Sequence, residues 1–228
     1  MAEWWAGVVE TFVSCFIKDD RYMLLVRGIG VTIKVSLLAA VLGIIIGFII
    51  AIFNLSEKKP LNIIGKIYTD IIRGTPSVTQ LMIIYFVVFA TVNWEKWIIA
   101  AIAFGINSGA YVAEIIRSGI MSIDPGQMEA GRSLGFNYIQ TMWHIIIPQA
   151  FKNVLPALGN EFIVLLKETS VAGYIALEDL TKGADIIRSQ TYSPFIPLLS
   201  VAAIYLGIVM LLSFLLKKLE RRLRSSER

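Results

Sequence analysis

The chain has 228 residues, of which 56% are hydrophobic and 17% are charged, and its mean hydropathy is +0.70. Globular proteins carry roughly 45–50% apolar and about 25% charged residues, so this composition favours an integral membrane protein. The net charge is only +4, and a single cysteine (Cys15) and a single histidine (His144) exclude an internal disulfide and argue against cysteine- or histidine-based metal and triad chemistry.

The N-terminal segment, residues 1–22, is expected to be a lead-in at the outer surface of the membrane. Its apolar residues are interrupted by Glu3 and Glu10, and it lacks the basic start of a secretory signal peptide. Trp4 and Trp5 suit the boundary between lipid and water. We therefore predict a short amphipathic helix here.

Five later segments are apolar enough for transmembrane helices, each of which needs roughly 20 mostly apolar residues. The fourth is the weakest, because Pro156 and charged residues such as Glu161 interrupt it. The predicted spans are residues 35–53 with an extension back to 28, 74–94, 97–120, 151–177 and 193–216. The sequence therefore predicts an all-α integral membrane fold with five transmembrane helices in a single domain, residues 1–228.

The basic residues outside these spans predict the orientation of the chain. Cytoplasmic segments of membrane proteins carry an excess of Lys and Arg. With the C-terminus inside, 13 of the 21 basic residues lie on the inner side and 6 on the outer side, while Lys34 and Lys167 lie within spans. We expect the N-terminus outside and the C-terminus in the cytoplasm. Residues 121–150 then form a cytoplasmic loop, and residues 178–192 form an outer loop with one short helix.

Small residues recur every three or four positions along the first span. Small side chains on one face let two helices approach closely in a membrane, which predicts a packing seam. Chance enrichment of glycine and alanine in membrane helices is the alternative. The residues of the expected seam are Thr32, Ser36, Ala40, Gly43, Gly47 and Ala51.

The cytoplasmic loop carries the turn signals of two short helices. Asp124 can cap the first helix, and Gln127 completes a pair like a capping box. Gly135 is a natural stop for that helix. Asn137 can cap the second helix, which Pro148 ends or kinks. The loop is thus expected to hold two helices that turn about a glycine.

The first of these helices offers a surface for another protein. Gly131 and Gly135 are expected to leave bare backbone where a partner can approach closely, with Ala130 beside them. Glu129 and Arg132 flank this backbone and can make charged contacts. A merely solvated connection between two spans is the alternative.

The spacing within this loop resembles the EAA loop of ABC importer permeases. That pattern reads EAA, three residues, G, nine residues, I, one residue, LP. The chain has the same spacing from Glu129 through Gly135 and Ile145 to Pro148, with Gly131 for the third Ala and Ile147 for Leu. Residues 28–52, 70–86 and 165–181 are similar to segments of the polar amino acid uptake branch of these permeases.

The resemblance implies a type I ABC importer permease in a prokaryotic inner membrane. It implies that the segment Glu129, Ala130, Gly131, Arg132 and Gly135 docks in a groove of a cytoplasmic ATPase subunit. It also implies a second permease copy, identical or related, and an extracytoplasmic solute-binding protein. The chain lacks the phosphate-binding pattern G-x-x-x-x-G-K-[ST], so we expect no catalytic residues, no metal and no bound cofactor, with ATP and Mg on the partner ATPase.

A polar group within the third span is the candidate substrate site. Asn107, Tyr111 and Glu114 follow a spacing of four and three and share one helical face. Glu114 can accept charge-assisted hydrogen bonds from an ammonium or guanidinium, and Tyr111 can add a cation–π contact. A polar, basic amino acid such as arginine or lysine is the expected substrate. Pairing of Glu114 with Arg117 or Lys167 as a structural bridge is the alternative.

Two further polar residues of the spans have competing interpretations. Glu161 either lines the same path or forms a hydrogen bond that holds helices together. Arg73, in the sequence RGTP, marks a helix start or kink and is expected to reach lipid phosphate. A proton-coupled secondary transporter or channel using Glu114 and Glu161 is the alternative function. The loop argues against it, because such a protein needs no ATPase dock.

Overall fold

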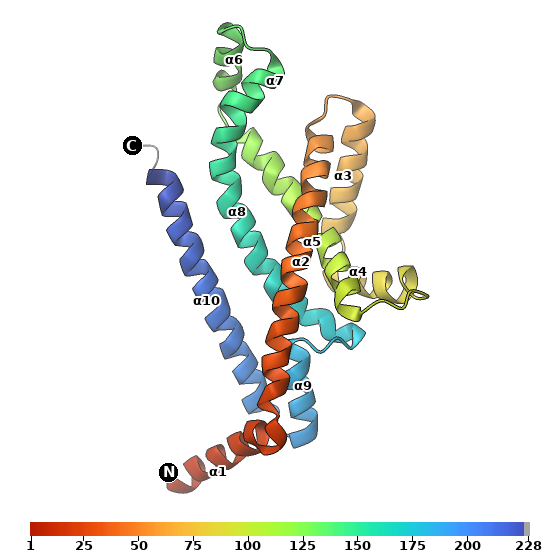
Figure 1. Cartoon of the computed structure of the whole chain (residues 1–228), viewed down its shortest axis with the longest axis vertical. Coiled ribbons are helices and arrows are strands. Elements are labelled where there is room, and N and C mark those ends of the chain that lie inside the picture. The colour runs from red at the N-terminus through yellow and green to blue at the C-terminus, as the bar shows by residue number, and fades with distance from the viewer. Residues whose placement is uncertain (226–228) are drawn as a thin grey trace. The chain divides into compact units, whose positions relative to one another are not determined.

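The computed structural model describes residues 1–225, apart from the side chains of residues 2–4 and 224–225. Trp4, expected at a membrane interface, therefore lies outside the description of side chains. Within the described range the regular elements are helices (Figure 1). The α-helices are α1 (Ala2–Phe12), α2 (Tyr22–Leu55), α3 (Lys59–Arg73), α4 (Ser77–Ile83), α5 (Lys96–Met121), α6 (Pro125–Ser133), α7 (Tyr138–Thr141), α8 (Ile147–Glu168), α9 (Leu180–Thr191) and α10 (Phe195–Ser225).

Short irregular turns extend or join these helices. Three are π-helical, Val13–Ile17 after α1, Ile84–Val88 after α4 and Met142–Ile146 before α8. Two are 3₁₀ turns, Lys18–Asp20 before α2 and Thr169–Ile175 after α8. Helix α1 agrees with the lead-in helix predicted for residues 1–22, and α9 agrees with the short helix predicted in the outer loop.

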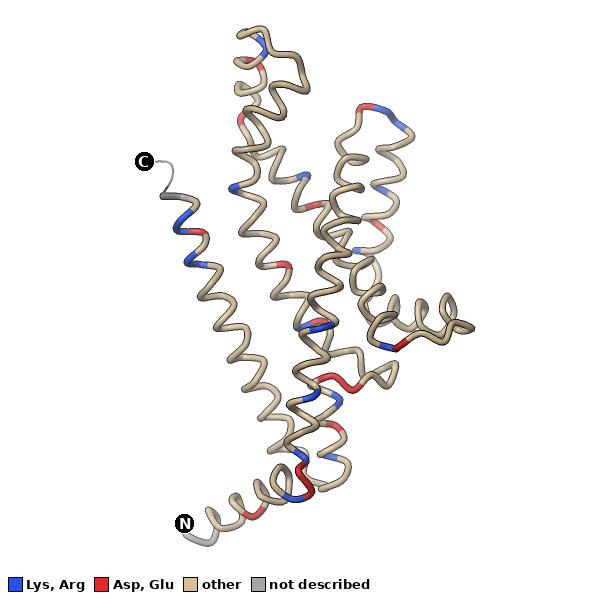
Figure 2. The backbone as a smooth tube through the Cα atoms, viewed as in Figure 1, with Lys and Arg blue, Asp and Glu red and all other residues tan. Residues whose placement is uncertain are grey.

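Three helices are long and apolar enough to cross a membrane. They are α2, α5 and α10, whose most apolar windows have mean hydropathies of 3.0, 1.6 and 2.5. A fourth candidate is the bent pair formed by α3 and the segment Ser77–Val88. Charged residues are sparse along the middle of α2 and α10 and gather near the end of α10 (Figure 2). The described chain thus offers three spans, or four if the bent pair is one span.

The second predicted span, residues 74–94, has different bounds in the structure. The helical segment after the break runs only from Ser77 to Val88, and α3 precedes it. Residues 59–73 were outside the predicted spans, and in the structure their charged side chains lie on one face of an amphipathic helix. The break falls where Pro76, with extended backbone at φ −63° and ψ 136°, precedes Ser77 at the start of α4.

The fourth predicted span, residues 151–177, ends earlier than expected. Helix α8 stops at Glu168, and the chain continues as a 3₁₀ turn to Ile175. Ala176 then adopts a left-handed conformation at φ 53°, which closes the turn. Pro156 lies inside α8 without ending it. The polar residues of α8 explain why it is not among the helices that reach membrane-spanning hydropathy.

The chain divides into two compact units. The first comprises Met1–Ala39, Pro76–Phe104 and Val164–Leu211. The second comprises Ala40–Thr75, Gly105–Ile163 and the residues from Leu212 onward. The single domain expected for residues 1–228 remains a prediction.

The first unit is built around α9. Leu180, Ala184 and Ile187 of α9 are fully buried in a cluster with Cys15 and Leu25. Helix α9 begins at Asp179, whose carboxylate accepts hydrogen bonds from the backbone N–H groups of Thr181 and Lys182 at 3.2 and 2.9 Å. Burial raises the pKa of Asp179 to about 6, although these backbone hydrogen bonds act in the opposite direction.

In the second unit the small residues of α2 pack against α5. A Cβ atom at Gly43 would lie 3.0 Å from Cβ of Ser108, and one at Gly47 would lie 2.5 Å from Cγ1 of Val112. Ala51, one turn further, is 1% exposed. These contacts confirm the predicted packing seam over this part of α2, because side chains larger than hydrogen would push the two helices apart.

Candidate functional site

The loop that follows α5 has the two-helix form predicted from its turn signals. Asp124 Oδ1 accepts a hydrogen bond from the backbone N–H of Gly126 at 2.7 Å, and Gly135 has a φ of +88°. Asn137 and Gln140 form a capping box with two hydrogen bonds of 2.9 Å. Gln127 differs from the prediction, because its Oε1 accepts a hydrogen bond from Gln149 Nε2 at 3.3 Å. Local capping therefore fixes both helix starts.

The two glycines of this loop have different surroundings. Gly131 is buried, and a Cβ atom there would lie 2.5 Å from Cγ2 of Thr141 and 3.0 Å from Cδ1 of Ile145. The expectation that Gly131 leaves bare backbone at the surface is therefore wrong. Its small size lets α6 pack against the helix that begins at Asn137. Gly135 is exposed, and its positive φ is the conformation that glycine adopts without strain.

The outer surface of the loop carries polar groups that the sequence indicated and apolar groups that it did not. Glu129, Ala130 and Arg132 are exposed, as expected of a docking helix. Several large apolar side chains beside them are also exposed. They are Leu134 (77%), Ile139 (75%), Trp143 (67%), Tyr138 (51%) and Phe136 (39%). Exposed apolar side chains on an otherwise polar loop are typical of a protein-interaction surface. The many apolar residues between positions 134 and 143 were the sign of this surface in the sequence.

The carboxylate expected to bind substrate, Glu114, lies in an ionic cluster of the second unit. Arg117 donates two hydrogen bonds to it, from Nη2 at 2.5 Å and from Nε at 2.9 Å. Arg73 Nη1 lies 4.0 Å from Glu114 Oε2. Of the structural bridges considered for Glu114, the structure therefore contains the one with Arg117. The side chain of Glu114 is still 31% exposed, so it remains accessible.

Tyr111 and Asn107, the other residues of the predicted polar face, differ in their exposure and in their contacts. Tyr111 is half-buried, and the guanidinium carbon of Arg73 lies 5.5 Å from its ring centroid. The ring face that was expected to meet a cationic substrate thus already meets Arg73. Asn107 is only 4% exposed. Ser108 donates a hydrogen bond to Glu161 Oε1 at 2.9 Å, which joins α5 to α8 within the second unit.

A polar cavity of about 610 Å³ contains the exposed part of this cluster. Helix α3 contributes Asn62, Lys66, Thr69, Asp70 and Arg73, α5 contributes Glu114, Arg117 and Met121, and Asn54 comes from the end of α2. Small-molecule sites commonly measure roughly 300–1,000 Å³, so this cavity has the size of one.

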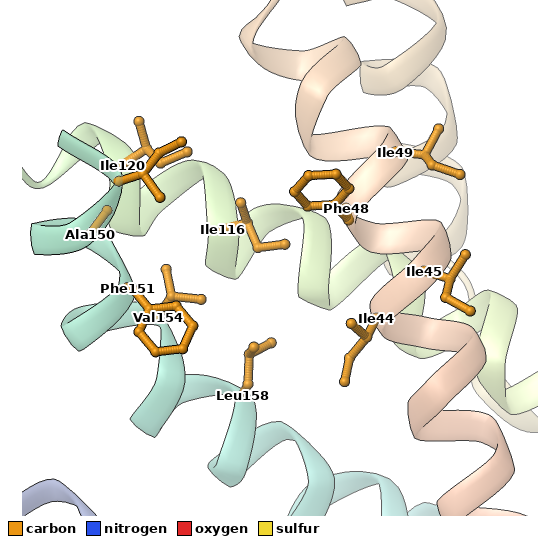
Figure 3. A pocket seen from close by; sticks show the side chains of 11 residues that line it. Ile44, Ile45, Phe48, Ile49, Ile116, Ile120, Ala150, Phe151, Val154 and Leu158 are labelled. Atoms are coloured by element: carbon orange, nitrogen blue, oxygen red, sulfur yellow. The ribbon is translucent and has the colours of Figure 1, made fainter. Parts of the chain in front are cut away.

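A second hollow in the same unit is apolar. It measures about 480 Å³ and is surrounded by side chains such as Ile45 and Phe48 of α2, Ile116 of α5 and Phe151 and Leu158 of α8 (Figure 3). Its lining offers no charged or amide group that could orient a polar solute. Among the side chains that the structure describes, no group of three or more His, Cys, Asp or Glu residues could hold a metal ion.

Comparison with known proteins identifies related chains over almost the whole length. The family model described as binding-protein-dependent transport system inner membrane component matches residues 43–225. The chain is 38% identical over 205 residues to the putative glutamine transport system permease protein GlnP of Rickettsia typhi, covering 89% of this chain and 94% of the relative. It is equally identical, with the same coverage, to the arginine transport system permease protein ArtQ of Bacillus subtilis.

Two solved structures have the same fold. A crystal structure of an amino acid ABC transporter with histidines matches with a TM-score of 0.84 at 45% identity, over 91% of this chain and 98% of the other. The methionine ABC transporter MetNI in an inward-facing conformation matches with a TM-score of 0.70 at 18% identity, over 89% and 97% of the two chains. At that identity the second match shows the fold alone.

Proposed function

Because the chain belongs to the family of binding-protein-dependent transport system inner membrane components, we propose that it serves as the permease subunit of an amino-acid ABC importer. Its relatives include permeases named for glutamine, arginine and L-cystine transport, and the solved structure at 45% identity is an amino acid ABC transporter. Permeases of this kind are non-catalytic, and a separate subunit hydrolyses ATP. The rival function, a proton-coupled transporter or channel, is not favoured.

The observation that carries this function is the capped two-helix loop between α5 and α8. We propose that Glu129, Ala130 and Arg132 of α6, together with the exposed apolar side chains of residues 134–143, dock in a groove of the ATPase. Gly131 and Gly135 take part indirectly, because they allow the close packing and the sharp turn that hold this surface. ATP and Mg bind to the ATPase, whose closure moves the loop and rocks the spans between outward-open and inward-open states.

The membrane arrangement in this proposal has five spans. They are α2, the bent pair of α3 with Ser77–Val88, α5, α8 and α10. The charge distribution supports an outer N-terminus and a cytoplasmic C-terminus in a prokaryotic inner membrane. The partners are a second permease copy, identical or related, the ATPase subunits and an extracytoplasmic solute-binding protein.

We propose a polar, basic amino acid such as arginine as the substrate. Glu114, Tyr111, Asn107 and Glu161 are the candidate binding residues of this chain. Support comes from the exposure of Glu114 to the polar cavity and from the relative ArtQ, which is named for arginine. Because Arg117 already holds Glu114, a cationic substrate would have to share this carboxylate rather than neutralise it alone.

The proposal is tested with the whole complex in lipid nanodiscs and in vesicles. We expect ATP hydrolysis and uptake to rise when the binding protein is added with one member of a panel of polar amino acids. Uptake that needs a proton gradient but no ATPase subunit would overturn the function. For the site, Glu114→Gln should reduce arginine uptake, whereas Glu57→Gln, an exposed carboxylate between α2 and α3, should not. Equal uptake by both variants excludes Glu114 from the site.

A further inference from the structure

Helix α3 has a polar face and an apolar face, although it belongs to a candidate membrane span. Its polar face carries Asn62, Lys66, Asp70 and Arg73, at spacings of four, four and three, and all four line the polar cavity. The opposite face exposes isoleucine side chains. They are Ile63 (53%), Ile64 (54%), Ile67 (53%) and Ile71 (58%). Polar side chains are costly in lipid, so this division directs the polar face toward a wet cavity.

The charges of the cavity do not balance. Lys66, Arg73 and Arg117 contribute three positive charges, whereas Asp70 and Glu114 contribute two negative charges. Arg117 directs its guanidinium at Glu114 through two hydrogen bonds. The cavity therefore has a net charge of +1, which attracts an anionic group.

Among these three cations, Arg73 is the one whose guanidinium lies over the ring of Tyr111. Its side chain is 42% exposed, and the nearest carboxylate oxygen is 4.0 Å away, beyond hydrogen-bond distance. No hydrogen bond to its guanidinium is found in residues 1–225, and its guanidinium carbon lies 5.5 Å from the ring centroid of Tyr111. The ring limits the directions in which the guanidinium can turn. An arginine in this position presents a planar fork of N–H donors, which matches a carboxylate in two parallel hydrogen bonds.

Asn54 also lines the cavity, but its side-chain oxygen does not open into it. Asn54 is 9% exposed, and its side-chain oxygen is buried without a hydrogen-bond partner in the described part of the chain. This oxygen lies against Gly65 of α3. The N–H donors of Arg73 are therefore the groups that the cavity offers to an anionic ligand.

We propose that this cavity binds the α-carboxylate of the transported amino acid and that Arg73 is the residue that receives it. The inference rests on the proposed function, and it names the part of the substrate that the second unit recognises. Arg73 recognises a group that every amino acid carries, so discrimination between side chains occurs elsewhere. A phosphate of a lipid headgroup is the other oxyanion that could meet Arg73, and the experiment separates the two.

The experiment measures ligand binding to the nucleotide-free complex in nanodiscs, without the binding protein. L-arginine is compared with L-argininamide, and L-glutamine with its α-amide, because each pair differs only in the α-carboxylate. We expect the wild-type complex to prefer the carboxylate at least about tenfold, since a charge-assisted pair is lost in the amide. Arg73→Gln should bind both members of a pair with the same weak affinity, and Arg73→Lys should keep part of the preference.

Lys59→Gln is the matched control, because Lys59 is an exposed cation on α3 outside the cavity. It should keep the full preference for the carboxylate. A preference that survives in Arg73→Gln overturns the inference, and so does a wild-type complex that imports arginine but does not distinguish it from its amide. If Arg73→Gln alters the response to replacing phosphatidylglycerol by phosphatidylcholine while it keeps arginine binding, the oxyanion is a lipid phosphate and the inference is wrong.

The outcomes also separate this inference from the proposed function. ATP-dependent uptake by the wild-type complex with its binding protein tests the function alone. If the wild-type complex takes up amino acids and Arg73→Gln keeps the preference for the carboxylate over the amide, the carboxylate site is rejected and the proposed function is retained. A wild-type complex that neither imports nor binds any amino acid rejects both.

Discussion

Gly131 and Thr141 lie so close together that a Cβ atom on residue 131 would be 2.5 Å from Cγ2 of Thr141. This contact joins the two short helices of the loop between α5 and α8. We expect Gly131→Leu to separate them and to lower ATP-dependent uptake at least about tenfold, because an overpacked contact forces the backbone to shift. Gly131→Ala should reduce uptake less, since it adds a single methyl group instead of a four-carbon side chain.

A second substitution tests whether this contact is the cause. Thr141→Ser removes Cγ2 but keeps the hydroxyl that donates to the carbonyl of Asn137 at 3.0 Å. We expect Thr141→Ser to restore the uptake that Gly131→Ala loses, measured in the same vesicles. If the double variant transports no better than Gly131→Ala, the packing of these two residues does not control the loop.

The exposed apolar side chains of the loop predict how the ATPase is held. Leu134 and Ile139 are 77% and 75% exposed, which places them among the most exposed large apolar residues of the described chain. We expect Leu134→Asp or Ile139→Asp to abolish co-purification of the ATPase, because a buried, unpaired carboxylate at an interface is costly. Tyr192→Asp, at a residue 93% exposed just after α9, is the control and should retain the ATPase. If all three variants still co-purify with the ATPase, the ATPase does not bind at these side chains of the loop.

The proposed orientation gives a separate prediction for the two loops. Cys15 is buried, so it should contribute little background to thiol labelling. A membrane-impermeant maleimide applied to intact cells should label Ser189→Cys in α9 and should not label Ser133→Cys in α6, both of which lie at exposed positions. Lysis should make both variants reactive. Labelling of Ser133→Cys alone in intact cells would reverse the orientation.

The loop between α5 and α8 could be predicted from sequence because its structure is local. The caps at Asp124 and Asn137 and the turn at Gly135 depend on residues within a few positions of each other. The burial of Gly131 could not be predicted in this way, because a glycine in a sequence looks the same whether it faces solvent or another helix. Gly131 is buried because Thr141 of the second helix lies against it, and this contact cannot be read from the glycine alone.

The polar groups of the spans were less predictable because their partners come from distant segments. Glu114 and Arg117 lie one helical turn apart, so their pairing was among the alternatives that the sequence offered. Arg73 was expected to reach lipid phosphate and was not assigned to the same cluster, since the sequence does not show that α3 lies beside α5. Periodicity would have identified α3 as a helix with isoleucines on one face, but it does not say which helix meets the other face.

Asp179 and Asp185 differ in how they respond to pH. Burial raises the pKa of Asp179 to about 6, above the value of about 3.9 expected in an unfolded chain. Hydrogen bonds from Lys182 and Arg188 lower the pKa of Asp185, which lies on the exposed side of α9. The unfolded chain releases the proton of Asp179 before the folded chain does. Stability from this residue is therefore greatest below about pH 4 and is lost as the pH rises toward 6.

Replacing Asp179 by asparagine removes this dependence, because an amide can cap α9 without ionising. From pH 4 to 6, we expect the free energy of local opening of α9 in the wild type to fall by about 2 kcal/mol relative to Asp179→Asn, because the pKa values of Asp179 in the unfolded and folded chain lie near the two ends of this range. Hydrogen exchange of the α9 amides at several pH values measures this difference, and the contribution of Asp185 cancels because both proteins contain it. A difference that stays constant between pH 4 and 6 would show that Asp179 is ionised throughout, held by the backbone N–H groups of Thr181 and Lys182.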